Sequence, residues 1–186
     1  MKIIGLAGTH ASGKDTIADY LVKNYGYFHV STGDIVREVA MQRYGSIERP
    51  VLYKTANEIR EADGHGATGH MALEKFEQVK DQYKGLVVSG FRAIAEAQAV
   101  KDKGGVIVFI DAPEQLRFER LRDRARVEEG VLSFEEFKKR EEAENGGVDP
   151  AFDISAIKSI SDYVIINKYN NKSEFINEVE KILGLA

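Results

Sequence analysis

The amino-acid sequence predicts an α/β protein built around a parallel sheet of five strands, with helices on both faces of the sheet. Short apolar runs of strand length alternate along the chain with longer segments whose apolar residues recur at helical spacing. Such alternation is typical of parallel sheets, because after each strand the chain must cross back to the end of the sheet where the next strand begins, usually through a helix. The length of 186 residues suits one buried core, so we expect a single domain over residues 1–186.

Composition narrows the class of protein further. The formal net charge of −4 provides no basic field for a nucleic-acid polymer. The sequence contains no cysteine, which excludes disulfides and cysteine-bound zinc. No apolar run reaches the ~18 residues of a membrane span, and the N-terminus lacks a secretory pattern. We therefore expect a cytoplasmic protein, a monomer or weak homodimer, that binds a small molecule and neither nucleic acid nor membrane.

The chain begins with a predicted strand, a glycine-rich turn and a helix. Residues 3–7 form an apolar run that predicts a buried strand. The stretch GTHASGKDT, residues 8–16, matches the Walker A spacing G-x-x-x-x-G-K-[ST] at both glycines and the lysine. Residues 15–25 have apolar side chains at helical spacing, and Gly26 ends the helix. A phosphate-binding loop requires this order, because loop amides and the helix N-terminus hold the phosphates together.

The remaining elements continue the alternation. Further apolar runs predict strands at residues 27–31, 85–90, 105–112 and 162–167. Apolar residues at helical spacing predict helices at residues 34–44, 52–62, 67–80, 95–103, 114–129 and 172–183. The stretch DGHGATG separates two of these helices, and residues 144–153 form the most loop-like stretch. Together the elements predict three layers, with the sheet between two layers of helices.

The glycine-rich loop is the strongest functional signal. Gly8 and Gly13 permit the backbone to approach phosphate oxygens closely, and Lys14 supplies a positive charge to the β- and γ-phosphates. Asp15 stands where the consensus has a hydroxyl, and Thr16 follows one place later. We therefore predict ATP with Mg²⁺ as the ligand. The residues predicted to bind it are Gly8, Ala11, Ser12, Gly13, Lys14, Asp15 and Thr16.

Three further stretches resemble P-loop nucleoside and nucleotide kinases. FHVSTGDIVREVA resembles the adenylate kinase segment after the second strand, with its S-T-G-D-x-x-R core intact. VVSGFRAIAEAQAVKDKGG resembles the DGFPR region of that family. It is closer to a strand–G–[IF]–R–x–x–x–E pattern of archaeal dephospho-CoA-kinase-like proteins and phage deoxynucleoside monophosphate kinases. SDYVIINKYNNKSEFINEVEKIL is similar to the ending of dephospho-CoA kinases.

The resemblance implies a three-layer P-loop NTPase fold with two functional additions. Its core would consist of residues 1–30, 85–115 and 160–186. A helical acceptor-binding insertion would occupy residues 31–80, and a lid would occupy residues 125–150.

The same resemblance implies a site for a nucleoside or deoxynucleoside monophosphate. Arg37 lies early in a predicted helix, and Arg92 follows the third predicted strand. We expect both at the carboxyl ends of the strands, where each guanidinium can grip phosphate oxygens bidentately. Arg37 could instead pair with Asp34 or Glu38. Glu96 is expected to share a helical face with Arg92 and to orient it or read the acceptor. The predicted acceptor-binding residues are Thr32, Asp34, Arg37, Arg60, Arg92 and Glu96.

Five arginines in the stretch PEQLRFERLRDRAR precede the expected lid. In the resembling kinases this element brings arginines to the phosphoryl group in transfer, where cationic donors stabilise the developing charge. We expect Arg120 and Arg124 to act there, with Arg120 also contacting the nucleotide. Lys14 and Arg92 complete the predicted catalytic set. Arg117 is a weaker candidate, and a solvated face explains the rest.

Two smaller features lie in the expected lid and after the last strand. Ser133 and Glu136 have the spacing of a capping box at the start of a helix. Asn167 opens the turn that in relatives passes the backbone around the donor adenine, so we expect it to bind the nucleotide.

The sequence departs from the resembling families at the metal site. Position 89 carries serine, where those families usually have an aspartate that organises Mg²⁺. Serine is a much weaker ligand for a hard cation. The candidate metal ligands are therefore Asp15, Thr16 and Ser89, with Asp15 acting through metal-bound water or capping the helix.

A second departure concerns the acceptor. Dephospho-CoA kinases use a D-x-D motif to deprotonate a sugar hydroxyl, whereas this chain has Thr32-Gly33-Asp34. A monophosphate needs charge neutralisation and no base, so a single aspartate with arginines favours a monophosphate. The leading hypothesis is transfer of the γ-phosphoryl group of ATP to a nucleoside or deoxynucleoside monophosphate.

Two alternatives stay open. One is dephospho-CoA-kinase-like transfer to a sugar hydroxyl. The other is a nucleotide-binding ATPase switch, in which VIVFID would be the Walker B strand ending at Asp111. Against the switch, Ala112 and Pro113 follow Asp111, where a glutamate would be needed to position water.

Overall fold

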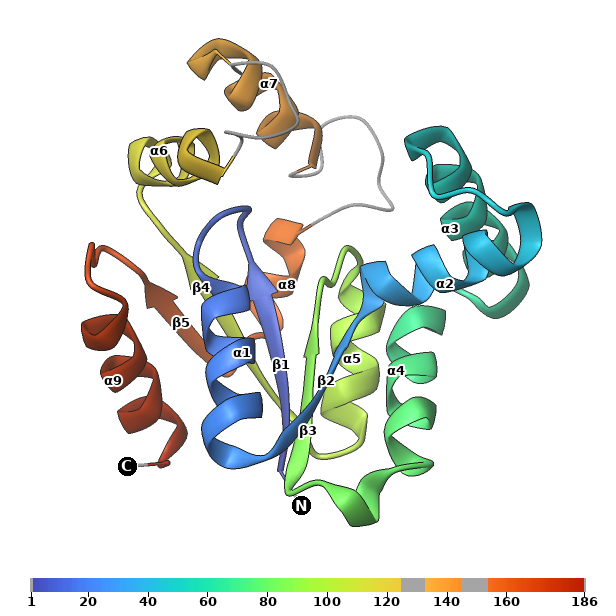
Figure 1. The fold of residues 1–186 in the computed structure, drawn as a ribbon, viewed down its shortest axis with the longest axis horizontal. Coiled ribbons are helices and arrows are strands. Elements are labelled where there is room, and N and C mark those ends of the chain that lie inside the picture. The colour runs from blue at the N-terminus through green and yellow to red at the C-terminus, as the bar shows by residue number, and fades with distance from the viewer. Residues whose placement is uncertain (1, 125–132, 145–153, 186) are drawn as a thin grey trace.

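Five parallel strands form one sheet in the order β2-β3-β1-β4-β5 (Figure 1). The structure is a computed structural model that describes residues 2–124, 133–144 and 154–185. The strands are β1 (Lys2–Gly8), β2 (Tyr27–Ser31), β3 (Gly85–Ser89), β4 (Val106–Asp111) and β5 (Tyr163–Ile166). Every neighbouring pair is parallel, so all five strands end at the same edge of the sheet.

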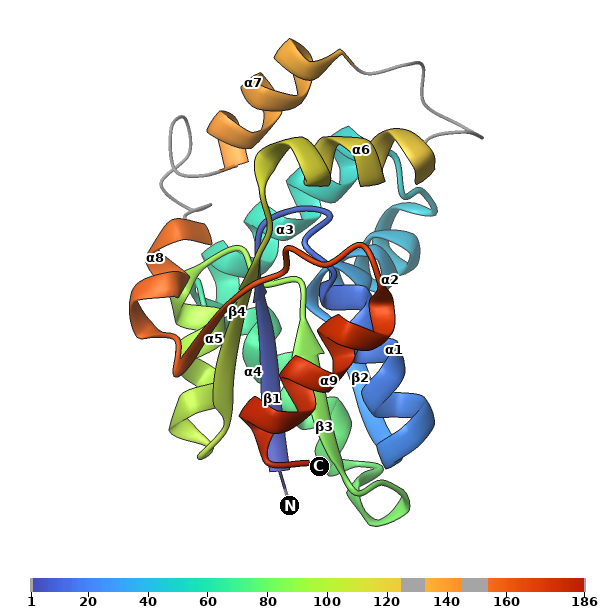
Figure 2. The same ribbon diagram turned by 90° about the vertical axis from the view of Figure 1, so that its left-hand side faces the viewer.

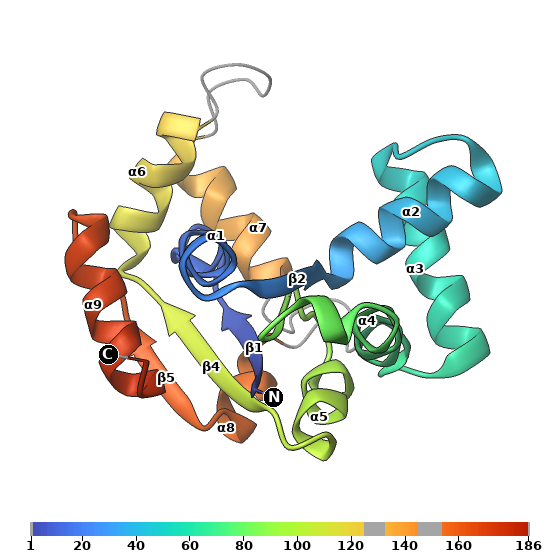
Figure 3. The same cartoon turned by 60° about the horizontal axis from the view of Figure 1, so that its bottom comes forward.

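Helices cover both faces of this sheet. They are α1 (Lys14–Tyr25), α2 (Thr32–Tyr44), α3 (Arg49–Asp63), α4 (Ala67–Glu77), α5 (Ile94–Asp102), α6 (Glu114–Arg124), α7 (Phe134–Glu144), α8 (Ile154–Ile160) and α9 (Lys172–Leu183). One core lies between the sheet and helices α1 and α9, and it includes Leu6 and Val108. A second core lies between the sheet and helices α4, α5 and α8, around Leu86 and Phe109 (Figures 2 and 3). Within the described part of the chain, no helix is long and apolar enough to cross a bilayer.

The remaining helices lie at the edge where the strands end. Helices α2 and α3 project beside β2 and β3, while α6 and α7 lie above the ends of β1 and β4 (Figure 1). The carboxyl ends of the strands are where ligands bind in open parallel sheets. The fold therefore places a helical pair on each side of the expected site.

The predicted fold class is confirmed, and the predicted helix at 172–183 has the observed bounds of α9. Helix α2 begins at Thr32, two residues before the predicted start, and α4 ends at Glu77 before a short 3₁₀ helix at Lys80–Gln82. Helix α8 was not predicted, because its seven residues are too few to show a helical period. The predicted helix 114–129 begins at Glu114 and is described as far as Arg124, and its last five residues lie outside the described ranges.

The expected lid is described only in part. Its residues 125–132 and 145–150 lie outside the described ranges, and α7 lies between them. The capping box is confirmed at the start of α7. The amide of Ser133 donates to Glu136 Oε2 at 2.8 Å, and the amide of Glu136 donates to Ser133 Oγ at 3.2 Å.

Helices α4 and α5 cross with almost no space between their backbones. A Cβ atom at Gly69 of α4 would lie 2.6 Å from the carbonyl oxygen of Glu96 and 3.0 Å from its Cα. A Cβ at Gly66, just before α4, would lie 3.1 Å from the carbonyl oxygen of Ala95. The stretch DGHGATG is thus more than a break between two helices, because its glycines allow α4 to touch the first turn of α5.

Replacing Gly69 with alanine should lower the free energy of unfolding by about 1–3 kcal/mol, because the two helices would have to move apart. Gly33→Ala in α2 is a matched control. Its added Cβ would meet Arg37 Nη1 at 3.4 Å and Ser31 Oγ at 3.6 Å, which are ordinary contacts. Urea unfolding followed by circular dichroism measures both variants. Equal unfolding free energies for the two would contradict the close α4–α5 crossing.

Candidate functional site

The glycine-rich loop joins β1 to α1 in a conformation that other residues would not fit. Gly8 has a φ of +128°, and a Cβ there would lie 1.8 Å from the carbonyl oxygen of Ile110. Gly13, the N-cap of α1, has a φ of +109°, and its Cβ would lie 2.7 Å from Asn167 Nδ2. Glycine at both positions allows the tight turn that brings the loop amides and the helix N-terminus together.

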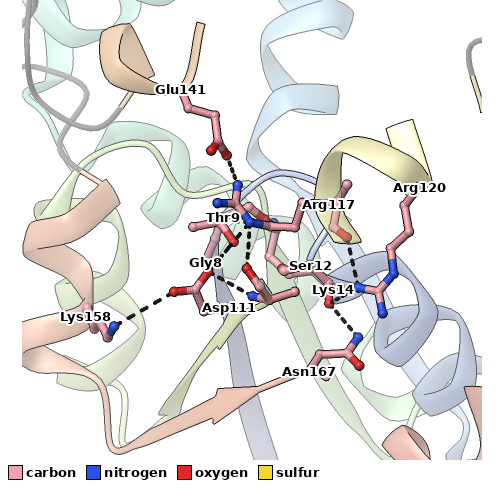
Figure 4. Close-up of polar contacts among 12 residues, drawn as sticks. Gly8, Thr9, Ser12, Lys14, Asp111, Arg117, Arg120, Glu141, Lys158 and Asn167 are labelled. Atoms are coloured by element: carbon pink, nitrogen blue, oxygen red, sulfur yellow. Dashed lines mark hydrogen bonds and ion pairs between the residues drawn. The ribbon is translucent and has the colours of Figure 1, made fainter. Parts of the chain in front are cut away.

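Several side chains hold this loop in place (Figure 4). Lys14 Nζ donates to the carbonyl oxygen of Gly8 at 2.9 Å and to that of Thr9. The hydroxyl of Thr9 donates to Asp111 Oδ1 at 2.7 Å, which ties the loop to the end of β4. Asn167 Nδ2 donates to the carbonyl oxygen of Ser12 at 2.7 Å. The loop is therefore held by its own Lys14 and by contacts from two other segments, the end of β4 and the turn after β5.

The loop fits a nucleotide phosphate. Ser12 lies in the loop and lines the adjacent pocket, and its buried hydroxyl has no hydrogen-bond partner among the described residues. A buried polar group without a partner is costly, and a phosphate oxygen held in the loop would supply one.

Arg120 reaches the loop from α6. Its Nη1 donates to the carbonyl oxygens of Ala11 at 3.3 Å and Ser12 at 3.5 Å, and its Nη2 donates to that of Tyr169 at 2.8 Å. Arg120 thus links the loop to the turn after β5, and Asn167, the first residue after β5, also binds the loop. The side chain of Arg124 lies outside the described part of the structure, so its role stays a prediction.

A pocket of about 510 Å³ extends from the glycine-rich loop toward α2 and α3. It brings together most of the residues that the sequence predicted for donor and acceptor. Among the residues that line it are Gly8, Ala11, Ser12, Gly13, Lys14, Asp15, Thr32, Asp34, Arg37, Arg60, Ser89, Arg92 and Glu96. Of the other described candidates, Arg120 and Asn167 contact the loop outside the pocket lining, and Thr16 lies in the first turn of α1.

Two helices begin at this pocket. Gly13 and Ser31, the N-caps of α1 and α2, both line it. Gly13 has no side chain to cap its helix, and the Ser31 side chain makes no capping hydrogen bond. The first amides of a helix and its dipole attract anions. The pocket therefore has two ends that are each suited to a negatively charged group.

The α2 end of the pocket carries the predicted acceptor residues. Arg37 Nη1 lies 2.7 Å from Asp34 Oδ1, which is one of the two surface pairings considered from the sequence. Both side chains are exposed, and exposed ion pairs contribute little, so Arg37 can exchange Asp34 for a bound anion. The Thr32 hydroxyl donates to the carbonyl oxygen of Gly90 at 2.7 Å, which joins the ends of β2 and β3. Thr32 is thus placed by a structural bond within the pocket wall.

Glu96 and Arg92 are connected in a way that the sequence did not predict. Helix α5 begins at Ile94, so Arg92 precedes the helix and the expectation of a shared helical face was wrong. Instead, the backbone amide of Arg92 donates to Glu96 Oε2 at 2.6 Å. Burial raises the pKa of Glu96 above its ordinary value. The hydrogen bonds that its carboxylate accepts from the Thr68 side chain and from the Arg92 and Ala93 backbones act in the opposite direction. Glu96 therefore holds the backbone that carries Arg92.

Ser89 is placed at the end of β3 and is paired with a histidine. Ser89 Oγ lies 2.8 Å from Nε2 of His29, and both residues line the pocket. Burial lowers the pKa of His29 below its ordinary value, which favours the neutral imidazole. The pocket lining thus holds a neutral pair at the position where the sequence comparison with the resembling families led us to expect an aspartate.

In the described part of the chain, protein ligands alone do not form a site for a divalent cation. The described residues include no group of three or more His, Cys, Asp or Glu side chains that could hold a metal. Mg²⁺ is usually held by one or two carboxylates together with substrate phosphates and water. Asp15 lines the pocket beside Lys14, so the site fits a cation that arrives with a nucleotide.

Arg117, the weaker of the arginine candidates, is buried and holds helices together. Its Nε donates to the carbonyl oxygen of Ala112 at 2.8 Å, and its Nη1 is paired with Glu141 of α7 (Figure 4). Its guanidinium also lies 5.6 Å from the centre of the Phe137 ring. These contacts place Arg117 at the junction of α6 with α7.

Among the contacts at the candidate site that sequence reasoning missed are those of Thr9 with Asp111 and of His29 with Ser89. Each pair joins residues that are far apart in the chain, at separations of 102 and 60 positions. The one available signal was that Asp111 and Ser89 both end buried strands that pair with β1.

Sequence comparison relates this chain to known proteins. An AAA domain family matches residues 4–144. A UPF0200 protein of Pyrococcus horikoshii is 32% identical over 187 residues, which cover 98% of this chain and 96% of that protein. A UPF0200 protein of Pyrobaculum aerophilum is 30% identical over 185 residues, covering 98% and 97%. A UPF0200/UPF0201 protein of Archaeoglobus fulgidus is 30% identical over 186 residues, and the match spans only 55% of its length.

Solved structures support the fold. An uncharacterized protein from Eubacterium ventriosum superimposes with a TM-score of 0.65 at 15% identity, covering 100% of this chain and 99% of that one. Shikimate kinase from Acinetobacter baumannii, in complex with shikimate, superimposes with a TM-score of 0.56 at 17% identity, covering 99% and 94%. At such identities the likeness concerns the fold alone, and it agrees with the predicted P-loop kinase superfamily. The chain belongs to the AAA domain family and to the UPF0200 proteins, and it has the P-loop kinase fold.

Proposed function

We propose that this protein is an ATP-dependent phosphotransferase that moves the γ-phosphoryl group to a nucleoside or deoxynucleoside monophosphate. One observation carries the proposal. The pocket has a helix N-terminus and basic side chains at each end, with Lys14 at the α1 end and Arg37, Arg60 and Arg92 toward the α2 end. A transfer between two phosphates requires two anion sites in one cavity, and this pocket offers both.

The chemistry of such a transfer is mostly positioning and charge. The loop amides and Lys14 would hold the donor phosphates. Arg37 and Arg92 would hold the acceptor phosphate. Their positive charges would offset repulsion between the two ligands and stabilise the charge that spreads over the transferred group. The acceptor oxygen is already nucleophilic, so no side chain has to remove a proton.

Mg²⁺ would supply charge neutralisation of the donor phosphates when bound. Asp15 would hold it through its water ligands, and the hydroxyl of Thr16 is the other candidate ligand. The neutral pair of Ser89 and His29 would contribute hydrogen bonds and no charge to this end of the pocket.

The decisive experiment measures ADP release from ATP with and without a panel of purine and pyrimidine monophosphates. A monophosphate kinase should be strongly stimulated by at least one member of the panel. ATP hydrolysis that no acceptor stimulates would favour a switch or ATPase and would contradict the proposal.

Lys14→Ala should reduce turnover on the order of a hundredfold or more, because a charge aimed at the transferred group is lost. Lys23→Ala, in the last turn of the same helix, is the control and should retain activity. Circular dichroism establishes that both variants fold. Near-normal turnover of the folded Lys14 variant would contradict phosphate binding by this loop.

Arg37→Ala and Arg92→Ala should each lower kcat/KM for the acceptor roughly tenfold or more, the worth of a charge-assisted hydrogen bond. The KM for ATP should stay nearly unchanged, because the loop that binds ATP is intact. Arg43→Ala is the matched control, since Arg43 lies on the same helix as Arg37 and pairs with Glu58. Losses that fall equally on ATP and acceptor would contradict an acceptor clamp.

A second candidate function is transfer to a sugar hydroxyl, which needs a base. It is favoured by one observation, that the carboxylate of Asp34 and the imidazole of His29 both line the pocket. Dephospho-CoA in the acceptor panel tests this candidate directly.

Asp34→Asn separates the two kinds of acceptor. With a monophosphate acceptor the loss of kcat should be modest and nearly independent of pH, because no proton is removed. With a hydroxyl acceptor the loss should be severe, and the acidic limb of the pH–rate profile should disappear. Steady-state kinetics between pH 5 and pH 9 measure the difference. A severe loss for Asp34→Asn beside mild losses for the arginine variants would favour the hydroxyl acceptor.

A further inference from the structure

The start of helix α4 lies against the pocket wall that carries Arg92. Helices α4 and α5 lie side by side (Figure 3). Because Gly66 and Gly69 have no Cβ between the two helices, Thr68 comes within hydrogen-bonding range of Glu96. The Thr68 hydroxyl donates to Glu96 Oε1, and both residues are nearly inaccessible to solvent. This contact joins two elements that are 28 positions apart in the sequence.

Both carboxylate oxygens of Glu96 accept hydrogen bonds from other residues of the protein. Oε1 accepts the Thr68 hydroxyl, and Oε2 accepts the amides of Arg92 at 2.6 Å and Ala93 at 3.2 Å. A buried carboxylate needs such donors, because it has given up its hydration. The side chain of Glu96 is therefore held from two sides, by α4 and by the turn before α5.

The turn held in this way forms part of the pocket. Gly90, Phe91 and Arg92 all line it, and the carbonyl oxygen of Gly90 accepts the Thr32 hydroxyl. The turn is thus fixed at Gly90 by the end of β2 and at Arg92 by Glu96. These hydrogen bonds restrain the backbone of Arg92, so its side chain extends from a fixed backbone position.

We propose that Thr68 and Glu96 are positioning residues that set Arg92 in place for an anionic acceptor, and that Glu96 does not itself read the acceptor. The proposal rests on the proposed function in that Arg92 is taken to bind the acceptor phosphate. It assigns a role to the DGHGATG stretch, which brings Thr68 of α4 to Glu96. The proposal can be tested by measuring binding. Mutation of a residue that contacts the variable part of the acceptor should change selectivity among acceptors. Mutation of a positioning residue should weaken the binding of every acceptor that carries the phosphate.

The experiment uses Thr68→Val, Thr68→Ser, Glu96→Gln and the double variant Thr68→Val/Glu96→Gln in the full chain. Thr55→Val is the matched control, because Thr55 is also buried and its hydroxyl donates to the carbonyl oxygen of Val51 within its own helix. Acceptor and ATP binding are measured separately by calorimetry, with AMP, GMP, dCMP and dTMP as acceptor probes.

Thr68→Val should weaken binding of each monophosphate that the unaltered protein binds by roughly three- to tenfold, the worth of one buried hydrogen bond. ATP affinity should not change, and Thr68→Ser should restore acceptor binding, since it keeps the hydroxyl. Glu96→Gln should act in the same direction without altering the order of preference among the probes. The double variant should be little worse than the worse single one, because both changes interrupt one connection.

Other outcomes would overturn the proposal. A changed order of preference in Glu96→Gln but not in Thr68→Val would make Glu96 a reader of the acceptor. Additive losses of acceptor affinity in the double variant, or equal losses of ATP and acceptor affinity, would mean that the two residues only stabilise the fold.

A measurement that needs no acceptor keeps the inference separate from the proposed function. In ¹⁵N–¹H spectra the Arg92 amide should shift and exchange faster in Thr68→Val, and it should stay unchanged in Thr55→Val. If no monophosphate binds the unaltered protein, the proposed acceptor class is wrong, and the Arg92 amide still decides whether Thr68 acts on Arg92 through Glu96. An unmoved Arg92 amide in Thr68→Val would overturn the inference even if a monophosphate binds.

Discussion

The site depends on the place where β1 passes the end of β4. Gly8 is in register with Ile110, and its Cα lies so close to that carbonyl group that any side chain would collide with it. The chain can therefore turn sharply into the glycine-rich loop and begin α1 within a few residues. Asp111, the next residue of β4, accepts a hydrogen bond from the Thr9 hydroxyl, and Asn167, directly after the neighbouring strand β5, donates one to the carbonyl oxygen of Ser12. Sheet register and loop conformation are thus one structural unit, and a phosphate would meet amides that are already in place.

The parallel sheet brings the rest of the site to this loop. Since all five strands end at one edge, helices α1 and α2 both begin there, and each directs its N-terminus at the same pocket. The positive ends of these helices and the basic side chains lie at the two ends of the cavity, while Ser89 and His29 supply a neutral pair between the strands. Such an arrangement suits chemistry that depends on holding two anions near each other, because it offsets charge and positions the reacting groups without requiring a base.

The two ends of the pocket are built differently. The loop end is held by short bonds to β4 and β5, whereas the α2 end is held by side chains that reach between helices and strand ends, such as Thr32 to Gly90 and Thr68 to Glu96. Arg37 is exposed and pairs with Asp34 on its own helix, and an exposed ion pair contributes little to holding it in one position. Arg92, in contrast, starts from a backbone fixed by a buried carboxylate. The α2 end thus combines one exposed guanidinium, that of Arg37, with one whose backbone is anchored, that of Arg92.

The sequence by itself determined the elements, their order and the loop, because strand alternation, helical period and the spacing of Gly8, Gly13 and Lys14 are local properties of the chain. It also brought Arg37 and Arg92 to the correct edge, since parallel strands must end together. Only the tertiary structure decided which side chains meet across that edge. Ser89 meets His29, and Glu96 accepts a hydrogen bond from the backbone amide of Arg92. These contacts follow from the crossing of elements that are distant in sequence, and local pattern contains no information on how closely two helices or strand ends approach.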